Sequence, residues 1–146
     1  MRILGLLILL LAVQRGYEAF SERQAAEAWR ALMATADTDG FLDVPPPEGQ
    51  DADTVYVVAA VNCGRESARL ADQLAKELAA QGVPVVRVDN ISFRQDRETV
   101  AAMHRLELVM KAPVPLVFIH GRVASTPELS HVIHEYYRSE RALARR

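Results

Sequence analysis

The chain has 146 residues, of which 50% are hydrophobic and 25% are charged, and its formal net charge is −2. This length accommodates one domain with extensions, and the apolar content is enough for a full hydrophobic core. The charge argues against a nucleic-acid-binding protein, which usually carries a basic patch. Because Cys63 is the single cysteine, the chain can form neither an intramolecular disulfide nor a zinc site built on cysteine pairs. We predict no metal site.

Residues 1–20 are predicted to be a membrane anchor or a signal segment. Arg2 precedes an apolar run from Ile3 to Val13, which at about 1.5 Å per residue is shorter than the roughly 30 Å of bilayer hydrocarbon. The length suits a signal peptide, whereas a helix continued to Phe20 comes close to spanning. We favour an uncleaved anchor, because the small-x-small pattern of a cleavage site is missing. The protein is then membrane-anchored or exported, which in a bacterium means the inner membrane or periplasm.

A stalk helix is predicted over residues 21–36, because Ser21 and Gln24 can form a capping box. Residues 37–53 are predicted to be a Pro-rich linker with a stiff centre at residues 45–47.

The stretch from Asp37 to Asp43 matches part of an EF-hand loop. Thr35 would stand at the first ligand position and Pro46 at the position of the bidentate glutamate. Both replacements remove coordination, so a calcium-linked structural protein is the least favoured of three functional interpretations.

Residues 54–140 are predicted to form a compact α/β domain, followed by a charged tail over 141–146. The patterns predict strands over 55–61, 83–89, 115–119 and 122–124, and helices over 67–81, 94–110 and from 129 onward. The first two strands enclose a helix and are therefore expected to be parallel. The short link His120-Gly121 predicts an antiparallel hairpin. The last helix is expected to start within Ser125–Glu128 and to fray from Arg138 onward.

The order β-α-β-α-β-β-α, with a cysteine ending the first strand, resembles the thioredoxin-like superfamily of thioredoxins and glutaredoxins. Two motifs carry the resemblance, which covers residues 54–137. The segment from Asn62 to Glu66 is similar to the Cys-x-x-Cys site, and the segment from Val114 to Val123 is similar to the family's stretch that begins with a cis-proline and ends in a glycine turn.

The resemblance implies that Cys63 is the nucleophile and that Pro115 is cis and faces it. A cysteine at the start of a helix meets unpaired N–H groups and the positive end of the helix dipole, and both favour the reactive thiolate. The resemblance also implies that the backbone at Val114 pairs with a bound substrate or glutathione like an added strand. Ser125 and Thr126 replace the Gly-Gly pair of glutaredoxins, which weakens the case for glutathione, although hydroxyls at a helix start can still hold a carboxylate.

One departure limits the chemistry. Glu66 stands where the family has its second cysteine, so a mixed disulfide cannot be resolved within the chain and only a monothiol cycle with an external thiol remains. The Glu66 carboxylate is expected to raise the pKa of the thiol, and Arg65 is expected to offset part of that effect.

The favoured function is therefore a membrane-anchored, monomeric protein with monothiol thiol–disulfide exchange at Cys63. Its partner would be a protein thiol or disulfide, or glutathione as a co-substrate, and no other cofactor is implied. The alternative is a catalytically inactive binding or assembly module of thioredoxin-like fold that uses the groove between Cys63 and Pro115.

The pair His131 and His134 lies on one predicted helix but lacks a third metal ligand nearby in the sequence.

Overall fold

The computed structural model describes residues 23, 24, 26–51, 53–59, 64–94 and 99–145. The chain divides into two compact units, Met1–Ala34 and Thr35–Arg146. In the first unit, residues 23, 24 and 26–33 are helical, as expected for the helix over 21–36. The anchor or signal segment expected over residues 1–20 lies outside the described residues, and the part of the chain that is described contains no helix long and apolar enough to cross a membrane.

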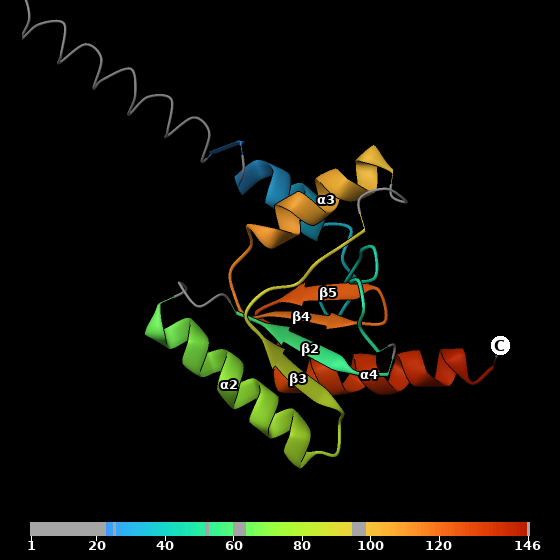
Figure 1. Cartoon of the computed structure of the whole chain (residues 1–146). Helices are drawn as coiled ribbons and strands as arrows, with labels where there is room; N and C mark the ends of the chain where they lie inside the picture. The colour runs from blue at the N-terminus through green and yellow to red at the C-terminus, as the bar shows by residue number, and fades with distance from the viewer. Residues whose placement is uncertain (1–22, 25, 52, 60–63, 95–98, 146) are drawn as a thin grey trace, which may run out of the picture. The chain divides into compact units, whose positions relative to one another are not determined.

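The second unit is an α/β domain built on a five-stranded mixed sheet (Figure 1). The strand order is β1-β5-β4-β2-β3, with β2 and β3 parallel and the three other neighbouring pairs antiparallel. From β2 onward the order of elements along the chain is the expected one. The elements are β1 (Leu42–Asp43), β2 (Val55–Val58), α2 (Arg65–Ala80), β3 (Val85–Val88), α3 (Val100–Met110), β4 (Leu116–Ile119), β5 (Arg122–Ser125) and α4 (Leu129–Leu143).

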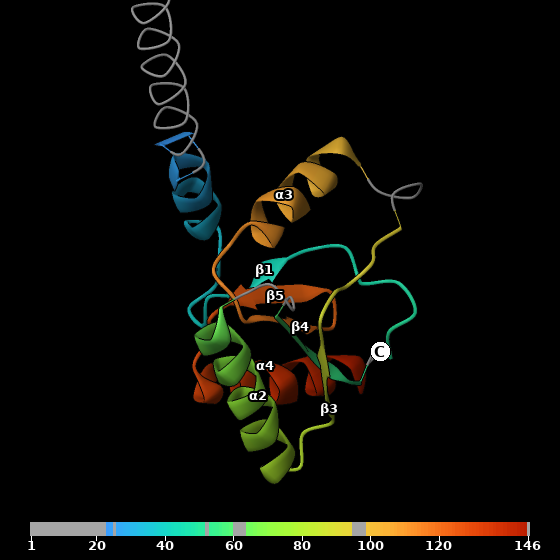
Figure 2. The same cartoon turned by 60° about the vertical axis from the view of Figure 1, so that its left-hand side comes forward.

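The helices lie on both faces of the sheet: α2 and α4 on one face, and α3 on the other (Figures 1 and 2). Helix α2 buries Ala71, Leu74 and Leu78, which recur at helical spacing. The central strand β4 is buried at all four residues, as expected for a strand that is covered on both faces. The α2 side of the sheet therefore holds the main core, which includes Val55, Val57, Val117, Ile119, Val132 and Tyr136.

The predicted hairpin between β4 and β5 is confirmed. Both residues of its link, His120 and Gly121, have positive φ angles of 49° and 75°, which is the backbone of a type I′ turn. A Cβ at position 121 would lie 3.4 Å from the carbonyl oxygen of Val44. Glycine therefore suits this turn both for its backbone and for the chain that passes beside it.

The prediction that residues 37–53 form a linker is wrong for its first part. Leu42 and Asp43 pair with Val123 and Arg122 of β5, and the preceding side chain, Phe41, is fully buried. A strand of two residues has no alternation for a sequence pattern to detect, and its place is decided by the sheet edge that β5 offers.

Helix α3 starts later than predicted. Arg94 is not helical, and the N-cap is Thr99, whose hydroxyl accepts a hydrogen bond from the Ala102 N–H at 3.2 Å.

The predicted boundaries of the last helix are also wrong. Ser125 ends β5, Thr126 has a φ of 46°, and the N-cap of α4 is Glu128. At the other end, α4 continues to Leu143 instead of fraying from Arg138, because side chains of its later turns bond back to its buried Glu135.

Candidate functional site

The start of α2 is the element that the sequence marked as the reactive centre. Cys63 itself, with residues 60–62, lies outside the described residues. The next residue, Gly64, is the N-cap of α2 and contributes no side-chain hydrogen bond to it. Backbone N–H groups of a first helical turn have no partner within the helix, so this terminus offers donors and the positive end of a dipole to a neighbouring anion.

Arg65 and Glu66 occupy the first turn of α2, and both side chains are exposed. Neither side chain has a hydrogen bond or an ion pair with another described residue. An acidic residue in the first turn also favours the helix by its interaction with the dipole.

The segment before β4 meets the end of β5, and this contact unites four of the predicted site residues. The Val114–Pro115 peptide bond is cis, as the resemblance implied. The Thr126 N–H donates to the Pro115 carbonyl at 2.8 Å, and the Ser125 hydroxyl donates to the Pro113 carbonyl at 2.6 Å. These bonds occupy the Ser125 hydroxyl and the Thr126 N–H, so neither group is available to hold a ligand carboxylate.

Two hollows flank this segment. The larger, which we call the Val114 groove, has a volume of about 600 Å³. Val58 from the end of β2, Ser67 from α2 and Val114 all line it. A smaller hollow of about 220 Å³ lies between α2 and the start of α4, and its lining includes Leu70, Pro115 and Thr126. Neighbouring residues Val114 and Pro115 thus line two different hollows.

The sequence analysis missed some of the residues that line the Val114 groove. Asp89 and Asn90, which follow β3, and Ser67, in the first turns of α2, contribute polar groups to it. Asp89 and Asn90 follow the carboxyl end of the parallel strand β3, and Ser67 lies at the start of the crossover helix α2. Sheets of α/β proteins commonly bind ligands at this end of their parallel strands. That general rule is the signal that could have found them.

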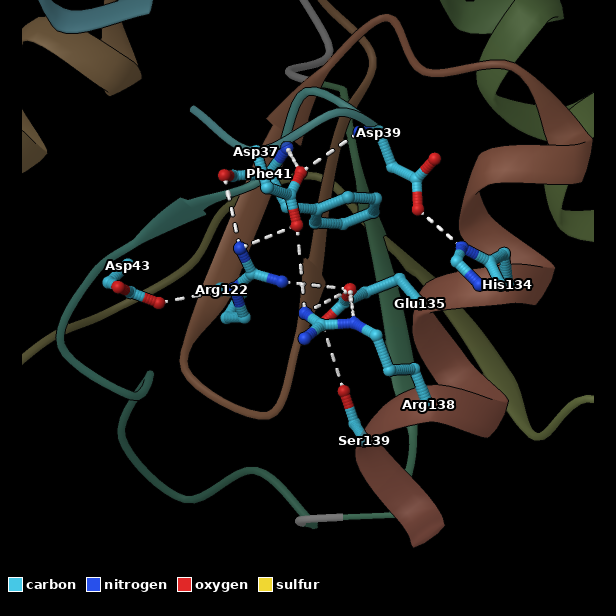
Figure 3. A network of polar contacts seen from close by, with 9 residues as sticks. All are labelled: Asp37, Asp39, Phe41, Asp43, Arg122, His134, Glu135, Arg138 and Ser139. Carbon is cyan, nitrogen blue, oxygen red and sulfur yellow. Dashed lines mark hydrogen bonds and ion pairs between the residues drawn. The ribbon is translucent and has the colours of Figure 1, made fainter. Parts of the chain in front are cut away.

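A buried polar network on the other side of the domain is a second candidate for a functional site (Figure 3). The Arg122 guanidinium lies 2.8 Å from Asp37 Oδ2 and 2.8 Å from Glu135 Oε2. Glu135 is fully buried and also accepts hydrogen bonds from Arg138 and Ser139 at 2.9 Å each. The network thus joins the segment before β1 to β5 and α4.

The charges in this network are matched to one another. Burial raises the pKa of Glu135, and its bonds from Ser139 and Arg122 oppose that rise. Although burial opposes ionisation of Asp37, hydrogen bonds from the Phe41 N–H and from Arg122 hold its pKa below the usual value. Because its groups pair with each other, we interpret the network as structural.

The structure argues against the EF-hand interpretation, because the carboxylates of this segment already have partners. Asp37 Oδ1 accepts hydrogen bonds from the N–H groups of Asp39 and Phe41 at 3.1 and 2.9 Å, while Oδ2 pairs with Arg122. The Asp39 carboxylate pairs with His134. Across the described part of the chain, no group of three or more His, Cys, Asp or Glu side chains is placed to hold a metal ion.

The lowered pKa of Asp37 predicts a pH dependence of stability. The stability that this carboxylate contributes is present above its unfolded pKa, near 3.8, and is lost as the pH falls through the lower folded value. We expect Asp37→Asn to destabilise the domain by about 1–3 kcal/mol near neutral pH, and the difference from wild type to shrink below pH 3.8. Urea unfolding between pH 7 and 2.5 measures this.

The matched control is Asp72→Asn, which removes the same charge from a 68% exposed side chain. It should stay within about 0.5 kcal/mol of wild type throughout. Burial raises the pKa of Glu135, which changes the stability in the opposite direction at pH values above the ordinary glutamate pKa of 4.5. The comparison is therefore decided below that pH. A difference between Asp37→Asn and wild type that is constant down to pH 2.5 would contradict the prediction.

The chain matches no protein-family model, and comparisons with curated proteins and with solved structures gave no match.

Proposed function

We propose that residues 54–140 form a thioredoxin-like domain. The order β3-β2-β4-β5, with β2 and β3 parallel and β4 antiparallel to both of its neighbours, supports this assignment. So does the placement of helices on both faces of the sheet (Figure 1). Strand β1 is then an addition at the open edge of β5.

The proposed function is monothiol thiol–disulfide exchange at Cys63. One observation carries it: residues on both sides of Cys63 in the chain, Val58 and Ser67, line the same groove as Val114. The connection that contains the thiol therefore starts and ends beside the segment that would bind a substrate backbone. The uncapped first turn of α2 supports a thiolate at that place.

The reaction balances with one external thiol. The Cys63 thiolate attacks one sulfur of a substrate disulfide, a new S–S bond forms to Cys63, and the other sulfur leaves as a thiolate. A second thiolate from outside the chain then attacks the substrate sulfur of this mixed disulfide. The substrate leaves as a disulfide with that thiol, and the Cys63 thiolate is regenerated.

A protein thiol or disulfide fits this site better than glutathione. The backbone N–H of Thr126 and the hydroxyl of Ser125 are already bonded to the carbonyls of Pro115 and Pro113. The Val114 groove is large enough for a peptide segment and has mixed polar and apolar walls.

A binding module without turnover is the second candidate, and the exposed Glu66 favours it. A carboxylate near the thiol raises the thiol pKa and lowers the fraction of thiolate. The same groove would then hold a partner peptide without chemistry. Attachment to a membrane through residues 1–20 remains part of both proposals.

The test is the rate of Cys63 alkylation by iodoacetamide as a function of pH, on the full chain. Because Cys63 is the single cysteine, labelling reports one site, and Cys63→Ser gives the blank. The exchange function requires an inflection below the pKa of an unperturbed cysteine thiol, about 8.5. Glu66→Gln should lower the inflection, and the matched variant Arg65→Gln should raise it, each by about half a pH unit.

Exchange is then measured directly with glutathione disulfide and with a small protein disulfide. We expect faster mixed-disulfide formation with the protein disulfide. An inflection at or above about 8.5, or no mixed disulfide with either substrate, would refute the exchange function and leave the binding module.

A further inference from the structure

Strand β3 is an open edge of the sheet. It is the last strand in the order β1-β5-β4-β2-β3 (Figure 1), and its one strand partner among the described residues is β2. The carbonyls of Pro84 and Val88 accept hydrogen bonds on the β2 side. Because successive residues of a strand turn their backbone groups to opposite sides, Val85, Arg87 and Asp89 turn theirs away from β2.

These outward-facing backbone groups of β3 have no hydrogen-bond partner in the part of the chain that the structure describes. The opposite edge of the sheet is protected. Strand β1 is two residues long, and its Asp43 carbonyl accepts a hydrogen bond from Arg105 Nη1 at 3.1 Å. Short or covered edge strands prevent pairing with another chain. Such protection is missing at β3, where the side chain of Val86 is also 44% exposed.

The charges on the β3 edge are opposite in sign. Arg87 and Asp89 lie two residues apart on one face of the strand and form an ion pair, and Arg87 also pairs with Asp72 of α2 at 3.1 Å. Like charges along an edge strand repel a second copy, whereas one positive and one negative residue can be matched by an identical strand. A two-fold axis requires such self-complementarity, because the same surface meets itself.

The positions of the two charges select one register for such a pair. If the two-fold axis passes through Val88, Arg87 of each copy lies directly opposite Asp89 of the other. The outward backbone groups of both residues then form an antiparallel ladder. An axis at Arg87 places two arginines opposite each other, and an axis at Asp89 places two aspartates so, and both are destabilising. An axis at Val86 leaves both charges without a cross-strand partner.

From these features we infer that two copies of the chain pair through their β3 edges, antiparallel and centred on Val88, in place of the monomer expected from the sequence. Main-chain hydrogen bonds join the two sheets into one. Two contacts between Arg87 and Asp89 across the axis fix the register. The interface is built from β3 and does not use the thiol, so it stands whether or not Cys63 exchanges disulfides.

The experiment is sedimentation velocity of the full chain in a mild detergent, with Cys63→Ser as the parent so that no intermolecular disulfide can form. We expect an equilibrium of monomer and dimer that depends on concentration. Arg87→Asp and Asp89→Arg each place like charges opposite each other, and each alone should weaken the dimer at least about tenfold. An equimolar mixture of the two variants restores opposite charges at both contacts. It should form a heterodimer with an affinity within about threefold of the parent.

The matched control reverses an exposed ion pair of α3 by the same changes of charge. Lys111→Asp and Glu107→Arg, alone or mixed, should leave the dimer affinity within about twofold of the parent.

Amide hydrogen exchange of the parent gives a readout that needs no charge-reversal variant. The N–H groups of Arg87 and Asp89 should exchange more slowly as the protein concentration rises, whereas that of Val86, which faces β2, should not change. The inference is overturned if the parent stays monomeric up to about 0.2 mM, or if exchange at Arg87 and Asp89 is independent of concentration. It is also overturned if either charge-reversal variant dimerises as tightly as the parent, or if their mixture forms no heterodimer although circular dichroism shows both to be folded.

Discussion

Replacing Arg122 by methionine should destabilise the folded domain by about 3 kcal/mol. The guanidinium is the shared partner of Asp37 and the fully buried Glu135, at 2.8 Å from each (Figure 3). Methionine keeps much of the apolar stem that lies along the protein but removes the charge. Glu135 would then retain Arg138 and Ser139, and a buried carboxylate that has lost one of its cations is costly. Urea unfolding at pH 7 measures the change.

Two variants show whether the effect comes from the buried charge. Arg87→Met removes an arginine that pairs with the exposed Asp72 and Asp89 at the sheet edge, and should cost less than about 1 kcal/mol. In the Arg122→Met background, Glu135→Met removes the uncompensated charge and should recover a large part of the loss. If Arg122→Met and Arg87→Met cost the same, the network contributes no more than a surface ion pair.

Truncating Phe41 to alanine should cost about 3–5 kcal/mol. The side chain is fully buried, belongs to the main core, and carries the Arg122 guanidinium over its ring at 5.8 Å. Its loss removes apolar burial and leaves a cavity under β1. Urea unfolding of the full chain gives the free energy of unfolding, and a lower denaturation midpoint with an unchanged slope would mark a loss of stability.

The matched control is Val100→Ala, at a residue that is 88% exposed, and it should change the stability by less than about 0.5 kcal/mol. The comparison also decides between two views of residues 37–43. A loss below about 1 kcal/mol for Phe41→Ala would agree with a linker, as the composition had indicated. A loss in the expected range makes this segment part of the folding unit.

Local patterns in the sequence were enough to predict most of the α/β domain. Val55–Val58 and Leu116–Ile119 are short apolar runs, and α2 repeats its apolar residues with the period of a helix. The link His120-Gly121 specified an antiparallel hairpin because these residues tolerate positive φ angles. These features depend on neighbours in the chain, so they can be read without a structure.

For the candidate sites, the sequence pointed to Val114, Pro115, Ser125 and Thr126, and the structure brings them together. The sequence could not show that the Ser125 hydroxyl and the Thr126 N–H are already hydrogen-bonded to backbone carbonyls. The burial of Glu135 could be predicted from the sequence, because Glu135 follows Val132 by three residues and so falls on the buried face of α4.

The sequence by itself determined the order of helices and strands from β2 onward, the parallel pairing across α2 and the hairpin of β4 and β5, because these follow from periodicity and turn chemistry over a few residues. Tertiary structure alone decided that Phe41 enters the core, that Leu42 and Asp43 join the sheet, that Glu135 is buried among cations and that the ring of His120 is buried against Tyr136. Each of these depends on a contact between residues that are far apart in the chain. Such a contact forms because a sheet edge, an apolar face or a buried charge needs a partner that no local pattern records.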